Sequence, residues 1–235
     1  MTAGRVLLIV QMAQARDDRV SRWLAAAGYR LDWRFMSNGD TLPDPRDDYD
    51  AVVVYGGPQS ANDDAATTPF IRDELDFIRA WSDRDKPFLG LCLGAQLLAR
   101  AHGGAVRHHP EGLSEIGYYP LRPTAAGEGL MPPPMRAYHW HSEGFEVPPG
   151  GELLAEGETF PNQAFRLGRH AYGLQFHPET TVPIFRTWMA EAPQMLDAPG
   201  AQDRETQFRY ALDHDAPLAA WLESFLPRWL GRDEG

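Results

Sequence analysis

The chain has 235 residues, of which 43% are hydrophobic and 23% are charged, a composition typical of globular proteins. Its net charge of −11 argues against nucleic acid as the main partner, because phosphate-binding surfaces usually carry clustered Lys and Arg. No apolar stretch of the sequence is long enough for a membrane span, and Cys92 is its single cysteine. We therefore expect a cytoplasmic protein without membrane attachment or intrachain disulfide.

The first hundred residues alternate between strand and helix patterns. Continuous apolar runs, typical of strands covered on both faces, and runs with helical spacing follow one another along the chain. The strand runs are 6–10, 29–35, 51–55 and 87–91, and the helical runs are 20–27, 70–81 and 93–102. Strands separated by helices predict right-handed crossovers. We therefore expect an α/β fold with a mostly parallel central sheet and flanking helices.

The second half of the chain has a different pattern. Residues 104–176 indicate shorter strands joined by turns, and a helix is expected to begin near Thr181. A further helix is predicted in the tail, with Pro217 near its start and apolar residues from Leu218 to Phe225 at helical spacing. We predict one domain over residues 1–200 and a C-terminal helical extension, residues 201–235, packed on it.

Cys92 lies at the centre of the sequence Gly90 to Gln96, GLCLGAQ. A strand leads into it and a helix leads out, and the glycines two residues before and after it resemble those of the G-x-S-x-G elbow of hydrolases. Such a turn presents the side chain at a helix N-terminus, where backbone N–H groups favour a thiolate. The pattern predicts a nucleophile, and the alternative is a buried, unreactive cysteine.

A cysteine nucleophile needs a base, and the base needs an orienting group. The best candidate is His177-Pro178-Glu179, in which a strand delivers His177 to its carboxyl end and the proline stops the strand. Glu179 can then bend back to one imidazole nitrogen while the other faces the sulfur. The alternative for Glu179 is an acidic residue at the start of a helix.

Two further histidines, His139 and His141, flank Trp140 in an H-x-H pattern that is compatible with metal binding. No third ligand with suitable spacing follows them, so we expect no metal at this position. No other cofactor is expected.

Three motifs in order resemble the class I (triad) glutamine amidotransferases: Gly56-Gly57-Pro58, the elbow around Cys92, and His177-Pro178-Glu179. The resemblance spans roughly residues 5 to 190 and implies a flavodoxin-like α/β fold. It is strongest to free-standing domains related to the amidotransferase part of GMP synthase. The segments that support this subgroup are GLCLGAQLLAR, EIGYYPL, HWHSEGFEVPPG, PNQAFRLG and YGLQFHPE.

The resemblance also implies roles for individual residues. Cys92 is the nucleophile, His177 the base and then the acid, and Glu179 the orienting carboxylate. The remaining roles are a backbone oxyanion hole from Gly57 and Leu93, and glutamine contacts from Gln96, Ser142, Gly144 and Phe145.

The implied activity is release of ammonia from L-glutamine through a thioester on Cys92. The sequence contains no Ser-Gly-Gly-x-Asp pyrophosphate loop and no P-loop, so this chain alone is not expected to make GMP. We expect a separately encoded synthetase or ligase subunit to accept the ammonia. The alternatives are a γ-glutamyl hydrolase acting on another γ-glutamyl compound, and a non-catalytic module on the same scaffold.

Overall fold

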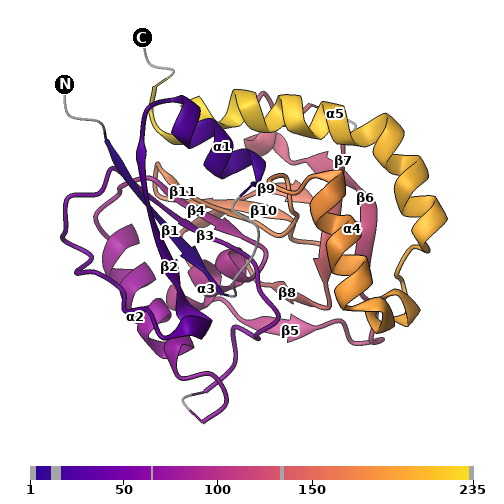
Figure 1. Ribbon diagram of the computed structural model, residues 1–235, viewed down its shortest axis with the longest axis horizontal. Helices are drawn as coiled ribbons and strands as arrows, with labels where there is room; N and C mark the ends of the chain where they lie inside the picture. The colour runs from indigo at the N-terminus through magenta and orange to yellow at the C-terminus, as the bar shows by residue number, and fades with distance from the viewer. Residues whose placement is uncertain (1–3, 12–16, 65, 133–134, 233–235) are drawn as a thin grey trace.

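A nine-stranded sheet with the strand order β2-β1-β3-β4-β11-β10-β9-β6-β7 forms the centre of the computed structural model, which describes residues 4–11, 17–64, 66–132 and 135–232 (Figure 1). Its strands are β1 (Arg5–Val10), β2 (Arg30–Phe35), β3 (Ala51–Val54), β4 (Phe88–Leu91), β6 (Glu115–Pro123), β7 (Met135–His141), β9 (Gly151–Glu156), β10 (Ala164–Leu167) and β11 (Ala171–Leu174). A separate two-stranded sheet pairs β5 (Val106–His108) with β8 (Glu143–Phe145).

Five helices accompany the strands within the described residues: α1 (Arg19–Ala26), α2 (Phe70–Ser82), α3 (Leu93–Ala101), α4 (Val182–Glu191) and α5 (Arg204–Trp229). Short 3₁₀ turns are η1 (Met36–Asn38), η2 (Ala125–Gly127) and η3 (Pro193–Asp197). None of the helices that the structure describes combines the length and the apolar character needed to cross a membrane.

The sheet is parallel in one half and antiparallel in the other. β2, β1, β3, β4 and β11 pair in parallel, whereas β10, β9, β6 and β7 continue the sheet with antiparallel pairs. The predicted α/β class with flanking helices is confirmed, and the sheet is mixed. Because β1, β3, β4 and β11 run in the same direction, their carboxyl ends meet at one edge, which is where sites form in such sheets.

Successive side chains of β1 point to opposite faces of the sheet, and both faces are buried, which is why the strand is apolar throughout. Val6 and Leu8 belong to a core cluster that contains residues of α1 and α5, whereas Leu7 and Ile9 belong to a cluster that contains residues of α2 and α3. Figure 1 shows these two pairs of helices on opposite sides of the parallel strands. Each such buried side chain contributes roughly 1.5–3 kcal/mol to folding.

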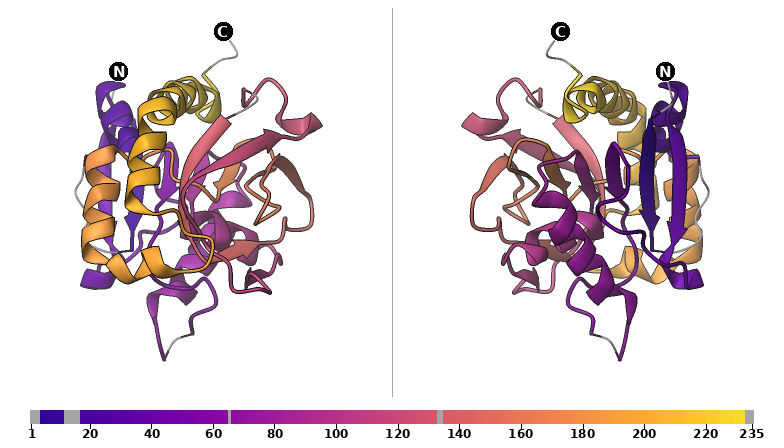
Figure 2. Two further views of the ribbon diagram at one scale, coloured as in Figure 1. Left: turned by 90° about the vertical axis from the view of Figure 1, so that its right-hand side faces the viewer. Right: turned by 90° about the vertical axis from the view of Figure 1, so that its left-hand side faces the viewer.

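The C-terminal helix α5 differs from its prediction. It begins at Arg204, where the side chain of Asp203 accepts a hydrogen bond from the Thr206 backbone N–H, so the predicted start near Pro217 is wrong. Pro217 lies inside the helix, where it removes one backbone hydrogen bond and crowds the preceding turn. Figure 2 shows α5 bending along its length, as an interior proline explains.

Apolar side chains of α5 from Leu218 to Trp229 belong to the same core cluster as Val6 and Leu8 of β1. Trp221, Phe225 and Trp229 are at most 4% exposed. This helix therefore covers one face of the sheet, while the domain boundary at residue 200 stays a prediction.

Arg19, the first residue of α1, connects three parts of the fold. Its guanidinium forms an ion pair of 2.7 Å with Asp215 of α5 and donates hydrogen bonds to the carbonyl oxygens of Pro178 and Thr180. Its backbone N–H donates to the carbonyl oxygen of Glu179 at 2.9 Å. The turn that follows β11 is therefore held against both α1 and α5.

Candidate active site

Cys92 occupies a sharp turn between β4, which ends at Leu91, and α3, which begins at Leu93. Its backbone has a φ of 49° and a ψ of −104°, a conformation that is strained for a residue with a side chain. Apart from glycines, only Asp85 shares a positive φ among the described residues. The surrounding structure therefore fixes the position of this cysteine against its local preference.

The two flanking glycines make this turn possible. A Cβ atom on Gly90 would lie 2.4 Å from the carbonyl oxygen of Gly94, and one on Gly94 would lie 2.1 Å from the carbonyl oxygen of Val54 in β3. Both positions are too close to backbone for any side chain. Glycine is therefore required at both positions, because α3 packs closely on β4 at Gly90 and on β3 at Gly94.

His177 reaches the same edge of the sheet because β11 pairs in parallel with β4. The backbone N–H of Cys92 donates to the carbonyl oxygen of Leu174, the last residue of β11, at 2.8 Å. Beyond that strand, the backbone N–H of His177 donates to the carbonyl oxygen of Tyr138 in β7, also at 2.8 Å. These bonds place His177 beside the turn that carries Cys92.

The imidazole of His177 contacts Glu179 on one side and the cysteine turn on the other. Its Nδ1 atom lies 2.8 Å from Glu179 Oε1, and both residues are 4% exposed. Nε2 is buried and makes no hydrogen bond with a described residue. A Cβ atom on Gly56 would lie 2.9 Å from His177 Cε1 and 3.3 Å from Cys92 Cβ, so the absence of a side chain there lets the two catalytic candidates approach.

A cavity of about 250 Å³ lies over this group. It is lined by Gly56-Gly57-Pro58, Trp140 and Trp188, together with Cys92 and His177. The Trp188 ring meets the imidazole edge-on, with centroids 5.0 Å apart. The cavity is therefore small, rich in apolar surface, and accessible to a molecule of amino-acid size.

Electrostatics favour a charged imidazole in this cavity. Burial alone would lower the pKa of His177, but the carboxylate of Glu179 and the sulfur of Cys92 outweigh it and raise the pKa to about 10. An imidazolium held between a carboxylate and a sulfur atom is the charge state that stabilises a thiolate nucleophile. The arrangement can therefore support both nucleophilic attack and proton donation.

The two predicted oxyanion donors lie next to the cysteine. Gly57 lines the cavity, and a Cβ there would lie 2.4 Å from Gln11 Cβ, so the loop packs tightly on the residue that follows β1. Leu93 is the first residue of α3, and its N–H therefore has no acceptor within that helix. Both backbone groups stay candidates for binding an oxyanion.

The other predicted substrate contacts lie behind the cavity wall. Gln96 is 4% exposed, and its Nε2 donates to the carbonyl oxygen of Glu143 in β8 at 2.9 Å. Phe145 is buried in the core cluster beside α3, and a Cβ on Gly144 would lie 2.5 Å from the Phe160 ring. Ser142, Gly144 and Phe145 do not line the cavity described above.

The structure also identifies contacts of the sulfur that the sequence motifs did not reveal. Gln175 is fully buried, and its Nε2 donates to Cys92 Sγ at 3.6 Å while its Oε1 lies 3.3 Å from Gln96 Nε2. The carbonyl oxygen of Trp140 lies 3.9 Å from the same sulfur. Gln175 follows β11 directly and precedes His177 by two residues, at a bend of the backbone, so the alternation of a regular strand does not predict where its side chain points.

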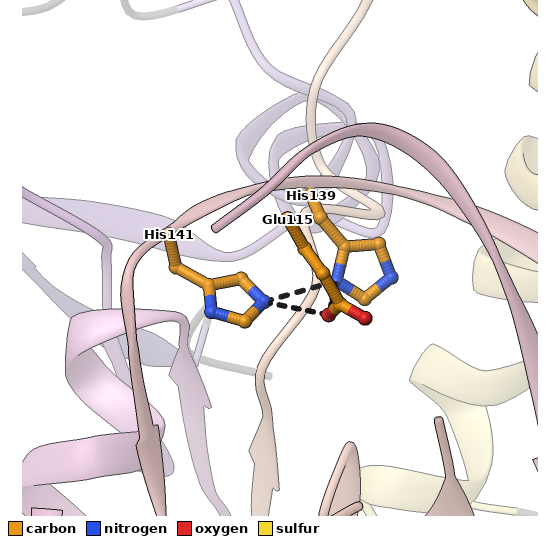
Figure 3. A group of neighbouring side chains, drawn as sticks. All are labelled: Glu115, His139 and His141. Carbon is orange, nitrogen blue, oxygen red and sulfur yellow. Dashed lines mark hydrogen bonds and ion pairs between the residues drawn. The ribbon is translucent and has the colours of Figure 1, made fainter. Parts of the chain in front are cut away.

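The H-x-H pattern lies on the side of β7 opposite Trp140. The imidazoles of His139 and His141 meet the carboxylate of Glu115 from β6, and all three residues are buried (Figure 3). The reason for expecting no metal at this position, the lack of a third ligand, is therefore wrong. Glu115 lies 24 residues before His139 and is brought to it by strand pairing, which local spacing does not reveal.

The fold and this site define an α/β protein with a cysteine at a nucleophile elbow and a histidine–glutamate pair beside it. The sequence model of the class-I glutamine amidotransferases matches residues 18–190. The chain belongs to this family.

Individual relatives agree with that membership. The chain is 34% identical over 206 residues to the putative glutamine amidotransferase-like protein YfeJ of Salmonella typhimurium, covering 83% of this chain and 84% of that one. It is 34% identical over 143 residues to a subunit of the glutamine-hydrolysing GMP synthase of Ignicoccus hospitalis, covering 59% and 71%. The crystal structure of a glutamine amidotransferase from Methylobacillus flagellatus is similar, with a TM-score of 0.90, 29% identity and coverage of 98% and 96%.

Proposed function

We propose that this chain hydrolyses L-glutamine to glutamate and ammonia with Cys92 as nucleophile, His177 as acid and base, and Glu179 as the group that orients the imidazole. The observation that carries the proposal is the meeting of these side chains at one cavity, with the cysteine on a strained turn of the kind that presents nucleophiles.

The reaction follows from the charge state of the site. Cys92, as a thiolate, attacks the carboxamide carbon of glutamine, and the oxyanion that forms is held by the backbone N–H groups of Gly57 and Leu93. The His177 imidazolium protonates the leaving nitrogen, so the C–N bond breaks and ammonia departs from a thioester. The neutral imidazole then removes a proton from water, which attacks the thioester and releases glutamate.

Glu179 supports both halves of this cycle. Its hydrogen bond to Nδ1 fixes the orientation of the ring and leaves Nε2 directed to the reaction. Trp140 and Trp188 line the cavity, and charge interactions beside apolar surface are less screened than in water.

The test is a glutaminase assay on the full chain that compares the wild type with Cys92→Ala. Removal of the nucleophile should lower glutamate release by more than the factor of about 10²–10³ that the loss of one oxyanion donor typically costs. A chloroketone analogue of glutamine should label the wild-type chain at Cys92. Equal rates in the two proteins, or no labelling of the folded wild type, would instead favour the non-catalytic module.

The same assay with a panel of γ-glutamyl amides and γ-glutamyl peptides distinguishes the substrate class. Glutamine should be the best substrate if this chain acts as an amidotransferase, whereas a γ-glutamyl hydrolase would prefer the longer compounds.

We further propose that a separately encoded synthetase or ligase receives the ammonia. This rests on the likeness to chains that are named as one subunit of a GMP synthase, because such a name describes part of an assembly. Co-purification with the product of a neighbouring synthetase gene, together with a rise in glutaminase rate on mixing, is the expected result. A rate that no synthetase or ligase changes would contradict it.

A further inference from the structure

The buried group behind the cavity wall, Glu115, His139 and His141, has no role in the proposed reaction. Strand pairing sets Glu115 of β6 directly opposite His141 of β7, and His139 lies two residues earlier on the same face. The three are 1%, 0% and 5% exposed. Figure 3 shows both imidazoles directed at the carboxylate. Two histidines and an acidic residue thus converge in a closed interior space.

The three facing atoms form a compact triangle. His141 Nε2 lies 3.1 Å from Glu115 Oε2 and 3.2 Å from His139 Nδ1, and the third side, from His139 Nδ1 to Glu115 Oε2, is 3.4 Å. Donor atoms at about 2.0–2.2 Å from one tetrahedral ion lie about 3.3–3.5 Å apart. The triangle therefore has nearly the dimensions of one face of a tetrahedral metal site.

Hydrogen bonds around the triangle direct lone pairs into it. His141 Nδ1 lies 2.9 Å from the carbonyl oxygen of Glu143, which can only accept, so Nδ1 carries a proton and Nε2 is the nitrogen available as a ligand. Glu115 Oε2 already accepts from Gln163 Nε2 at 2.8 Å. Ligating histidines in proteins typically donate their second nitrogen to a carbonyl oxygen in this way.

His139 completes the triangle. Its Nδ1 atom lies 3.2 Å from His141 Nε2 and 3.4 Å from Glu115 Oε2. Its Nε2 is buried and has no hydrogen-bond partner among the described residues. Each residue thus offers one ligand atom to the same small space, and a single cation could bind all three.

We propose that Glu115, His139 and His141 bind a zinc ion that cross-links β6 and β7. Two imidazoles and one carboxylate are ligands that zinc accepts in tetrahedral sites. The enclosure argues for a structural ion, because aromatic rings cover the group: Phe160 stands 4.8 Å from His141, and Tyr119 stands 5.6 Å from His139, between ring centroids.

The position of the ion gives it a function in shaping the site. The carbonyl oxygen of Glu143 faces both His141 Nδ1 and Gln96 Nε2, each at 2.9 Å. Trp140, which lies between the two histidines in sequence, lines the active-site cavity on the other side of β7. The ion would therefore fix the wall that holds Trp140 and the segment that follows it.

The experiment uses the full chain with Cys92→Ala as the parent, because a free thiol beside His177 would bind zinc by itself. Zinc content is measured by mass spectrometry after purification, and zinc affinity by competition with a chromophoric chelator after mild denaturation and refolding without metal. Glu115→Gln and His141→Gln are introduced into the parent, and His108→Gln, whose side chain is 72% exposed, is the matched control.

One equivalent of zinc is expected in the parent and in the control. Each ligand variant should lose at least about 100-fold in affinity, since loss of a supporting residue alone typically costs 10–100-fold. Cobalt(II) in the parent should show the strong visible absorption of a tetrahedral site without a thiolate band, a readout that does not depend on the folding of any variant.

Two results would overturn the proposal. The first is a folded parent that binds neither zinc nor cobalt stoichiometrically, which would show that hydrogen bonds alone hold the three residues together. Undiminished affinity in both ligand variants would show that any bound zinc lies elsewhere.

Discussion

The backbone angles of Cys92 connect the steric and the chemical sides of the site. A positive φ at a non-glycine residue costs roughly 1–3 kcal/mol, and it persists only where neighbouring contacts enforce it. Here the contacts are the backbone of β3 against Gly94 and the hydrogen bond from the Cys92 N–H to Leu174. Backbone packing thereby fixes the direction in which the Cys92 side chain leaves the turn.

Gly94→Ala should therefore damage the site through the backbone. The new methyl would overlap the Val54 carbonyl oxygen, so α3 must move away from β3, and we expect a loss of at least about 2 kcal/mol in the free energy of unfolding, at the upper part of the overpacking range. Chemical denaturation measures it. Gly112→Ala is the control without a clash: its methyl would meet nothing within 4 Å, and its φ of 69° adds a backbone cost that Gly94 does not have. A loss no greater than that of the control would contradict the packing argument.

Glu179→Gln should lower the pKa of His177, because the neutral amide removes the charge that favours the imidazolium. Nuclear magnetic resonance titration of labelled histidines follows the change directly. A His177 pKa that stays near 10 in the variant would show that Glu179 does not stabilise the charge.

The same pair predicts a pH dependence of stability. The folded pKa of His177 lies above the value of about 6.5 in an unfolded chain, so the imidazolium stabilises the fold fully below pH 6.5, and this contribution is lost as the pH rises through about 10. The free energy of unfolding should thus fall more steeply between pH 6.5 and 10 in the wild type than in Glu179→Gln.

At the scale of elements, α5 is the part whose place was hardest to foresee. Its apolar spacing from Leu218 onward indicated a helix, but Pro217 suggested a start at the wrong point. The proline is tolerated because the buried contacts of the helix stabilise it by more than the loss of one backbone hydrogen bond destabilises it. These contacts are tertiary, so the local sequence does not predict them.

Leu222→Ala should cost about 2–5 kcal/mol in the free energy of unfolding, because Leu222 is 1% exposed within the core cluster. Leu212→Ala on the same helix is the control, since Leu212 is 84% exposed and should change stability by less than about 0.5 kcal/mol. Thermal and chemical unfolding should each show a single transition. A separate transition for α5, with the loss confined to it, would instead favour an independently folding extension.

For the whole molecule, the parallel half and the antiparallel half were foreseeable to different degrees. Buried apolar strands separated by amphipathic helices predict the parallel half and, through its shared edge, the meeting of Cys92 with His177. The order of β10, β9, β6 and β7 depends on pairings between distant segments, for which the sequence contains no local pattern.

That difference explains which contacts were missed. The Cys92, His177 and Glu179 motifs lie next to parallel strands, so their meeting at one edge was predicted from the sequence. Glu115 is cross-strand to His141 in the antiparallel half, and the contact of Gln175 with the sulfur depends on two neighbouring strands. Contacts made by strand register become visible only when the register is known.

The guanidinium of Arg19 connects the C-terminal helix to the loop that carries Glu179. It donates hydrogen bonds to the carbonyl oxygens of Pro178 and Thr180, on either side of Glu179, and forms an ion pair with Asp215 of α5. A small displacement of α5 would pull on the loop that sets the angle of the imidazole.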